Sequence, residues 1–219
     1  NPGDVSLVVE PTASAPALYS GKPLVPIQGS VRLVAMADLR TSPGVRLDPG
    51  TLSYTWTVDG RTLYNSSGIG RSSIVVPSPL QYRETDILVK VTSRDGSLTG
   101  GHTTTITPGT PVLRLYENNP LLGILFDHAL ANSFALSGTE TTVIAVPYSF
   151  SVCARTPSIA WFLNGSSAQS GENITLRPTG SGQGTAALSV TAQQDGTYES
   201  AAAALSVIFG EKASSFFGL

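Results

Sequence analysis

The fold is decided by the stretch Leu52-Ser-Tyr-Thr-Trp56-Thr-Val-Asp59-Gly60, which recurs further along the chain as Ser158-Ile-Ala-Trp161-Phe-Leu-Asn164-Gly165. Apolar and polar residues alternate up to the tryptophan in the first copy, and the second copy has a short apolar run, Ile159-Ala-Trp161; both patterns are typical of a β-strand. The Asp-Gly and Asn-Gly pairs that follow favour a tight hairpin turn, because both of their residues take positive φ at little cost. Each copy is therefore expected to be a strand that buries its tryptophan and ends in a hairpin.

The repeat extends beyond this motif. Val5–Glu10 matches Val112–Glu117, Leu33–Met36 matches Val143–Val146, and Val89–Thr92 with Asp95-Gly96 matches Leu188–Thr191 with Asp195-Gly196. The matches keep their order at a spacing of about 100 residues, which is the size of an ordinary domain. We therefore predict two domains, residues 1–108 and 109–210, followed by a tail, residues 211–219. The prolines of Thr107-Pro108-Gly109-Thr110-Pro111 favour a short, stiff linker between the domains.

Strand-like runs fill both predicted domains, and helical periodicity is almost absent. The runs are rich in Val, Thr, Ile and Tyr, and 22 Gly and 15 Pro separate them. The expected strands lie near Val5–Glu10, Ser30–Ala37, Leu52–Val58, Ser72–Val76, Asp86–Ser93, His102–Thr107, Val112–Glu117, Thr141–Pro147, Ser158–Leu163, Asn173–Arg177, Thr185–Ala192 and Ala202–Phe209. We predict an all-β fold of two tandem immunoglobulin-like β-sandwiches, with Trp56 and Trp161 in the cores and with Asp59, Gly60, Asn164 and Gly165 in the turns.

A tryptophan on the third strand, followed by a tight turn, resembles the immunoglobulin-like superfamily, and within it the PKD-like and bacterial Ig-like domains of extracellular proteins. The sequence departs from antibody-type domains, which have a cysteine pair around the tryptophan, and from the full W-x-F-G-D-G of typical PKD units. More loosely, Leu115–Gly123 and Phe216–Leu219 look like parts of uncharacterised exported proteins of Patescibacteria. These resemblances imply a cell-surface or secreted location and no particular activity. The start at Asn1 fits either a removed signal peptide or a trimmed clone.

Composition excludes several classes of function. The formal net charge is −2 and no basic cluster occurs, so a nucleic-acid partner is not expected. No apolar run approaches the length that crosses a bilayer. Cys153 is the only cysteine, which rules out a disulfide within the chain, and we expect it to be a small buried hydrophobe. We predict no cofactor and no metal site, because the acidic residues are dispersed.

The residue types that carry catalysis are scarce. The two histidines are His102, expected on a solvent-facing strand, and His128, expected to pair with Asp127 in a loop. Nucleophile and zinc motifs such as G-x-S-x-G and H-E-x-x-H are absent. We therefore predict that the chain is not an enzyme. Sequons occur at Asn65, Asn164 and Asn173, and in a eukaryotic secreted protein they would be glycan acceptors.

Two apolar segments have no place in the repeat. The tail contains Phe216, Phe217 and Leu219, which either fold back on the second domain or dock on a neighbouring subunit or partner as an assembly contact. The run Pro120–Phe126 is expected in the core of the second domain rather than in an exposed patch.

These observations predict a non-catalytic extracellular module that is structural or adhesive, with a protein partner or self-association. One form is a filament subunit, because a head-to-tail contact that does not close makes fibres. The alternative is a carbohydrate- or protein-binding module that uses loops at the ends of the sandwiches. Its candidate ligand platforms are Tyr19, Tyr64, Tyr82 and Tyr148, which also suit strand packing.

Overall fold

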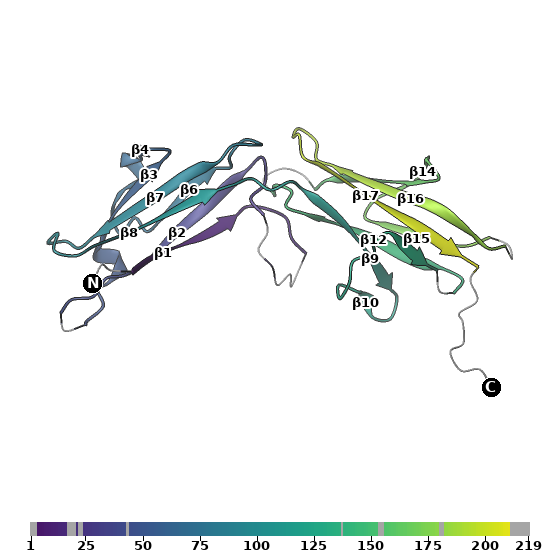
Figure 1. Cartoon of the computed structure of the whole chain (residues 1–219), viewed down its shortest axis with the longest axis horizontal. Coiled ribbons are helices and arrows are strands. Elements are labelled where there is room, and N and C mark those ends of the chain that lie inside the picture. Colours follow the sequence, from purple (N-terminus) through teal and green to yellow (C-terminus); the bar gives the residue numbers. More distant parts are fainter. Residues whose placement is uncertain are drawn as a thin grey trace. The chain divides into compact units, whose positions relative to one another are not determined.

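The computed structural model describes residues 4–16, 21, 24–42, 44–136, 138–152, 156–179 and 182–210. They form two compact units (Figure 1). The first contains the described residues of 4–13, 24–110 and 151–152, and the second contains those of 14–16, 21, 111–150 and 156–210. The main division falls between Thr110 and Pro111, inside the proline-containing segment. Among the described residues, no helix has the length and apolar character needed to cross a bilayer.

The first unit is a sandwich of two sheets. Strands β1 (Asp4–Pro11), β2 (Ser30–Asp38) and β6 (Ser73–Pro77) form one sheet in that order. The second sheet has the order β4 (Arg61–Thr62), β3 (Ser53–Val58), β7 (Thr85–Thr92), β8 (Thr99–Ile106), and β5 (Gly68–Ile69) also pairs with β3. Short 3-10 turns occupy Pro49–Thr51 and Tyr64–Ser66. The sheets correspond to the A-B-E and C′-C-F-G strands of an immunoglobulin-like domain.

The second unit repeats this topology with additions. Its first sheet has the order β10 (Gly123–Ile124), β9 (Val112–Asn119), β12 (Thr141–Tyr148), β15 (Asn173–Leu176). Its second has the order β11 (Ser133–Ala135), β17 (Ser200–Phe209), β16 (Gly184–Gln193), β13 (Ser158–Leu163), β14 (Ser166–Ser170). Strand β11 runs parallel to β17, and the other pairs are antiparallel. The all-β fold of two tandem immunoglobulin-like sandwiches is therefore confirmed.

Five short strands, β4, β5, β10, β11 and β14, were not expected from the sequence. Each is two to five residues long. Strand β14 reads Ser-Ser-Ala-Gln-Ser and is exposed at every position, so it carries no apolar alternation. It is a strand only because it continues the hairpin that begins at Asn164.

Alternation of buried and exposed residues produces a separate core in each unit. Along β7, for example, Ile87, Val89 and Val91 are fully buried and the residues between them are exposed. The first core includes Val31, Leu33, Leu52, Tyr54, Trp56, Ile74, Ile87, Val89 and Val91. The second includes Leu113, Leu115, Val143, Phe150, Ile159, Trp161, Ile174, Leu188 and Val190.

The two tryptophans occupy equivalent places in these cores. Both rings are fully buried. Trp56 Nε1 donates to the carbonyl of Arg71 at 2.8 Å, and Trp161 Nε1 donates to the carbonyl of Gly171 at the same distance. Arg71 and Gly171 lie just before β6 and β15, so the two indoles link β3 to the start of β6 and β13 to the start of β15, in each case across the two sheets. A buried indole N–H needs such a partner.

The turn after each tryptophan is also equivalent in the two units. Asp59 and Asn164 take positive φ, 47° and 50°, as do Gly60 and Gly165. Asp59 donates its N–H to Asp86 O at 2.9 Å and accepts from Asp86 N through Oδ1 at 2.9 Å. Asn164 makes the same two bonds with Ala187, each at 2.8 Å. This explains why Asp or Asn stands here: each tolerates the backbone conformation and also supplies the accepting oxygen.

The turn between β7 and β8 is stabilised by a carboxylate. Asp95 Oδ1 accepts from Ser93 Oγ at 2.5 Å and from Ser97 N at 3.1 Å, and Asp95 Oδ2 accepts from Ser97 Oγ at 2.8 Å. Hydrogen bonds from Ser93 and Ser97 favour the ionised form and lower the pKa of Asp95 to about 2. Gly96 follows in the left-handed conformation, with φ 74°.

The two hairpin turns give a first prediction. Asp59→Asn and Asn164→Asp should each change the free energy of unfolding by less than about 0.5 kcal/mol, because both side chains keep the acceptor and tolerate positive φ. Asp59→Ala and Asn164→Ala should each destabilise the chain by about 1–3 kcal/mol, because a strand N–H loses its partner and the backbone becomes strained. Urea unfolding followed by circular dichroism measures both, and equal stability of the swap and alanine variants would contradict the interpretation.

Candidate functional site

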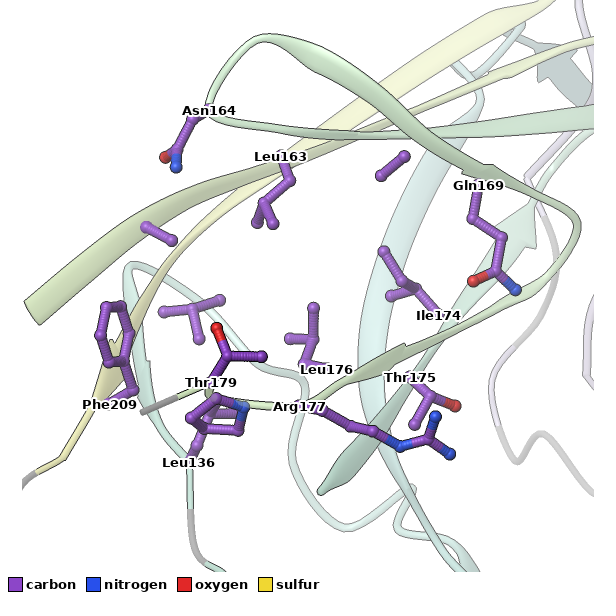
Figure 2. Close-up of a pocket in the computed structure, with 14 residues that line it drawn as sticks. Leu136, Leu163, Asn164, Gln169, Ile174, Thr175, Leu176, Arg177, Thr179 and Phe209 are labelled. Carbon is purple, nitrogen blue, oxygen red and sulfur yellow. The ribbon is translucent and has the colours of Figure 1, made fainter. Parts of the chain in front are cut away.

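A pocket of about 540 Å³ lies in the second unit (Figure 2). Residues of β13, β14, β16 and β17 contribute to its lining from one sheet, and β15 contributes from the other. Leu136, which follows β11, and Arg177–Thr179, which follow β15, complete it. The pocket therefore lies between strands that belong to the two different sheets of one sandwich.

The walls of the pocket are mainly apolar. Figure 2 shows Leu163 and Leu176 projecting into the space from opposite sides, with the Phe209 ring at one end. Ile174, Leu176 and Val207 also belong to the buried core, whereas Leu136, Leu163 and Phe209 are half-buried. The polar lining residues are Asn164, Gln169, Thr175, Arg177 and Thr179, and all five are exposed.

Most polar side chains at the rim already have partners in the fold. Asn164 Oδ1 accepts from Ala187 N, Gln169 Nε2 donates to Asn173 O at 3.0 Å, and Thr175 Oγ1 pairs with Thr142 Oγ1 at 3.0 Å. Arg177 Nε donates to Glu140 Oε2 at 2.7 Å. A ligand would therefore gain more from apolar contact than from polar recognition, which favours apolar side chains as the occupant.

Two glycines fix the Phe209 end of the pocket. Gly184 lies directly opposite Phe209 in the β16–β17 pairing. A Cβ on Gly184 would lie 2.8 Å from Phe209 Cζ, so the ring packs over the bare glycine backbone. Gly210 has φ 77° and is closely packed against Gly182 and Gln183. The position of the Phe209 ring thus depends on Gly184 and Gly210, because a side chain at either residue would overlap its neighbours.

Both strands at the sides of the pocket are edge strands. β15 is last in the order β10-β9-β12-β15, and β14 is last in the order β11-β17-β16-β13-β14. Each pairs on one side only among the strands of the described residues. Unpaired strand edges of this kind accept an added extended segment.

A second feature of this unit is the β9–β10 hairpin. Its tip carries Leu121 and Leu122, which are 92% and 75% exposed. Asn119 Oδ1 accepts from the N–H of both leucines, at 2.9 and 3.1 Å. The tip is therefore an apolar projection with an ordered backbone.

The prediction that Pro120–Phe126 belongs to the core of the second domain is wrong, because none of these residues is in that core and Phe126 is 44% exposed. The residues after the tip pack only against a small separate cluster on β9 and β12. Ile124 contacts the small cluster of Tyr116, Ile144 and Val146, and the Phe126 ring lies edge-on to Tyr116 at 5.0 Å. An apolar run does not distinguish a hairpin tip from a core strand, because the turn signal here is only Asn119-Pro120 and Gly123.

The candidate tyrosines that the structure describes belong to both units. Tyr64 and Tyr82 belong to the first unit and are 83% and 92% exposed. Tyr82 has φ 63° and lines a hollow with Gln81, Arg83, Glu84 and Thr107. Tyr148 is half-buried in the second unit, and its hydroxyl lies 2.8 Å from the Tyr116 hydroxyl. Tyr19 lies outside the described residues, as do Cys153, Phe216, Phe217 and Leu219.

Neither histidine lines the pocket. His102 is exposed on β8 of the first unit. His128 Nδ1 lies 3.0 Å from Asp127 Oδ2 on the surface of the second, and this hydrogen bond lowers the pKa of Asp127. Within the described part of the chain, no group of three or more His, Cys, Asp or Glu residues could hold a metal ion. The sequon residues Asn65 and Asn164 are exposed, and Asn173 is half-buried with its Oδ1 accepting from Asn118 Nδ2.

Comparison with known proteins gives structural similarities only. The sequence matches no family model and no curated protein. Among solved structures, the three N-terminal domains of the bacteriophage RB49 outer capsid protein Hoc match with 14% identity and a TM-score of 0.45, over 94% of this chain and 59% of that one. The fibronectin(III)-like modules of Clostridium thermocellum CbhA match with 10% identity and a TM-score of 0.31, over 90% and 95%. Sidekick-1 immunoglobulin domains 1–5 match with 10% identity and a TM-score of 0.28, over 97% and 60%.

The glycine under Phe209 gives a second prediction. Gly184→Ala should destabilise the chain by about 1–3 kcal/mol, because the new methyl group overlaps the ring and forces it to move. Gly182→Ala is the matched control: its Cβ would meet nothing within 4 Å, so the change should stay within about 0.5 kcal/mol. Thermal and urea unfolding compare the two, and the idea fails if both variants behave alike.

Proposed function

We propose that the chain is a non-catalytic structural and adhesive module of an exported surface protein, and that it acts through protein contacts, including contacts with its own copies. The observation that carries this proposal is the β9–β10 hairpin tip, with two leucines almost fully in water on an ordered turn. The resemblance of the tryptophan motif to PKD-like and bacterial Ig-like domains supports the surface location.

The hairpin tip has the energetic properties of a contact site. Burying a leucine side chain stabilises a complex by about 1.5–3 kcal/mol. Ordering a flexible loop would consume part of this gain, but Asn119 already fixes the backbone of Leu121 and Leu122. If the tip of one copy meets a different surface of the next, the contact repeats without closing and a filament results.

The third prediction tests this proposal. Sedimentation velocity and negative-stain electron microscopy of the purified chain should show concentration-dependent self-association. Leu121→Ser/Leu122→Ser should weaken it at least tenfold, which corresponds to about 1.4 kcal/mol. Leu80→Ser is the control, because Leu80 is 68% exposed on a loop of the first unit. A chain that stays monomeric, or equal association of all three proteins, would exclude self-assembly through the hairpin.

Carbohydrate binding in the first unit is the second candidate, and the Tyr82 hollow favours it. There a 92% exposed tyrosine in the left-handed conformation stands beside Gln81, Arg83 and Glu84, in a hollow of about 560 Å³. An exposed ring flanked by hydrogen-bonding side chains offers one apolar face and several polar contacts to a ligand.

A glycan array gives the fourth prediction. Any saccharide that binds should lose at least tenfold in affinity with Tyr82→Ala, because the ring face is removed, and should keep its affinity with Tyr64→Ala, a change at another tyrosine exposed in the same unit. Titration calorimetry with the selected saccharide measures the change. Absence of any array signal, or equal losses in both variants, would remove this candidate.

A further inference from the structure

The pocket of the second unit has apolar walls that a protein segment could cover. Leu136, Leu163, Leu176 and Phe209 face a space of about 540 Å³, large enough for several side chains. The polar rim is largely engaged within the fold, so apolar contact dominates. A matching occupant needs two or three large apolar side chains and a backbone that can lie along an edge strand.

We propose that the pocket takes the segment Glu211–Leu219 of the same chain, with Phe217 and Leu219 directed into it. This segment follows β17 and lies outside the described residues. In an extended conformation alternate side chains point to the same face, so Phe217 and Leu219 share one face and Phe216 lies on the other. Phe217 and Leu219 would therefore enter the pocket together. One is aromatic and the other aliphatic, and both can make apolar contacts with the Leu and Phe side chains of the walls.

Chain connectivity places this segment within reach. Phe209 is part of the pocket wall, and only Gly210 separates it from Glu211. Residues 211–216 span up to about 20 Å when extended. The two sheets of a sandwich lie about 10 Å apart, so the segment is long enough to pass from the end of β17 to the β15 side of the pocket.

The edge strand β15 supplies the second half of the site. It forms one side of the pocket and ends its sheet. A segment added along this edge would gain main-chain hydrogen bonds while its alternate side chains enter the pocket. The first residues, Glu211-Lys212-Ala-Ser-Ser215, are charged or small and suit a connection that remains in water.

Tethering favours the chain's own segment over that of a second copy. A short connection gives a tethered segment a local concentration in the millimolar range, well above micromolar amounts of free protein. The pocket is then an intramolecular binding site for the chain's own tail. Any apolar segment of another protein must compete with the tail for the pocket. This inference is independent of the hairpin contact proposed above, because it involves neither Leu121 nor Leu122.

The fifth prediction uses the full chain and a labelled peptide. Fluorescence anisotropy would measure binding of a peptide of residues Glu211–Leu219, with an N-terminal fluorophore, to the unaltered chain and to the full-length variant Phe216→Ser/Phe217→Ser/Leu219→Ser. The peptide should bind the serine-tail variant at least tenfold more tightly, because no tethered competitor occupies its pocket. A peptide with the same three serines should not bind.

Variants of the pocket test whether the peptide binds there. In the serine-tail background, Ala186→Trp fills the pocket and should abolish peptide binding, whereas Ala202→Trp, at an exposed position of β17, should leave it unchanged. Circular dichroism checks that each variant folds. Thr179→Trp at the exposed rim replaces Ala186→Trp if the latter does not fold, and it should weaken binding at least fivefold.

Three results would overturn the inference. One is equal peptide affinity of the unaltered and serine-tail chains, and another is binding that survives the pocket variants. The third is a dimer of the unaltered chain that the serine-tail changes alone convert to monomer, since the occupant would then come from a second copy. The Leu121→Ser/Leu122→Ser chain should bind the peptide as the unaltered chain does, so failure of the hairpin proposal is distinguishable from failure of this one.

Discussion

Both sandwiches depend on one interaction: a fully buried indole whose N–H donates to a carbonyl just before a strand of the opposite sheet. Trp56 reaches Arg71 O and Trp161 reaches Gly171 O, both at 2.8 Å. The ring fills the space between the sheets, and its one polar group requires an acceptor, so the bond specifies where the second sheet lies relative to the first. Three positions after each tryptophan, Asp59 and Asn164 donate their N–H groups to carbonyls of β7 and β16, respectively.

The fold could be predicted from sequence because these constraints are local. A tryptophan at the end of a strand-like run, followed by Asp-Gly or Asn-Gly, predicts a buried ring and a hairpin from nine residues or fewer. Strand β14 could not be predicted, because its residues are polar and exposed and only its pairing with β13 makes it a strand. The pocket could not be predicted either. Leu136, Leu163, Leu176 and Phe209 are far apart in sequence, and each fits an ordinary core position.

The features that distinguish the second unit lie mainly in one connection. Between β9 and β12 the chain forms the Leu121-Leu122 tip, the Phe126 contact on Tyr116, and strand β11, which leads to Leu136 at the pocket. The first unit makes the corresponding connection, from β1 to β2, with no strand of its own among the residues described there. Sandwich loops tolerate such insertions, and this one also supplies Leu130, Phe134 and Leu136, which pack against the core.

Core and site therefore follow different physical rules in this chain. In the core, period-two alternation and one hydrogen bond per indole leave little choice of residue, so the two units remain recognisable as copies. At the β9–β10 hairpin, apolar side chains lie where the sandwich does not need them: Leu121 and Leu122 contribute nothing to either core. Exposed leucines on an ordered turn lower solubility unless another surface covers them, so the hairpin tip is selected by what it contacts and the core by what holds the sheets together.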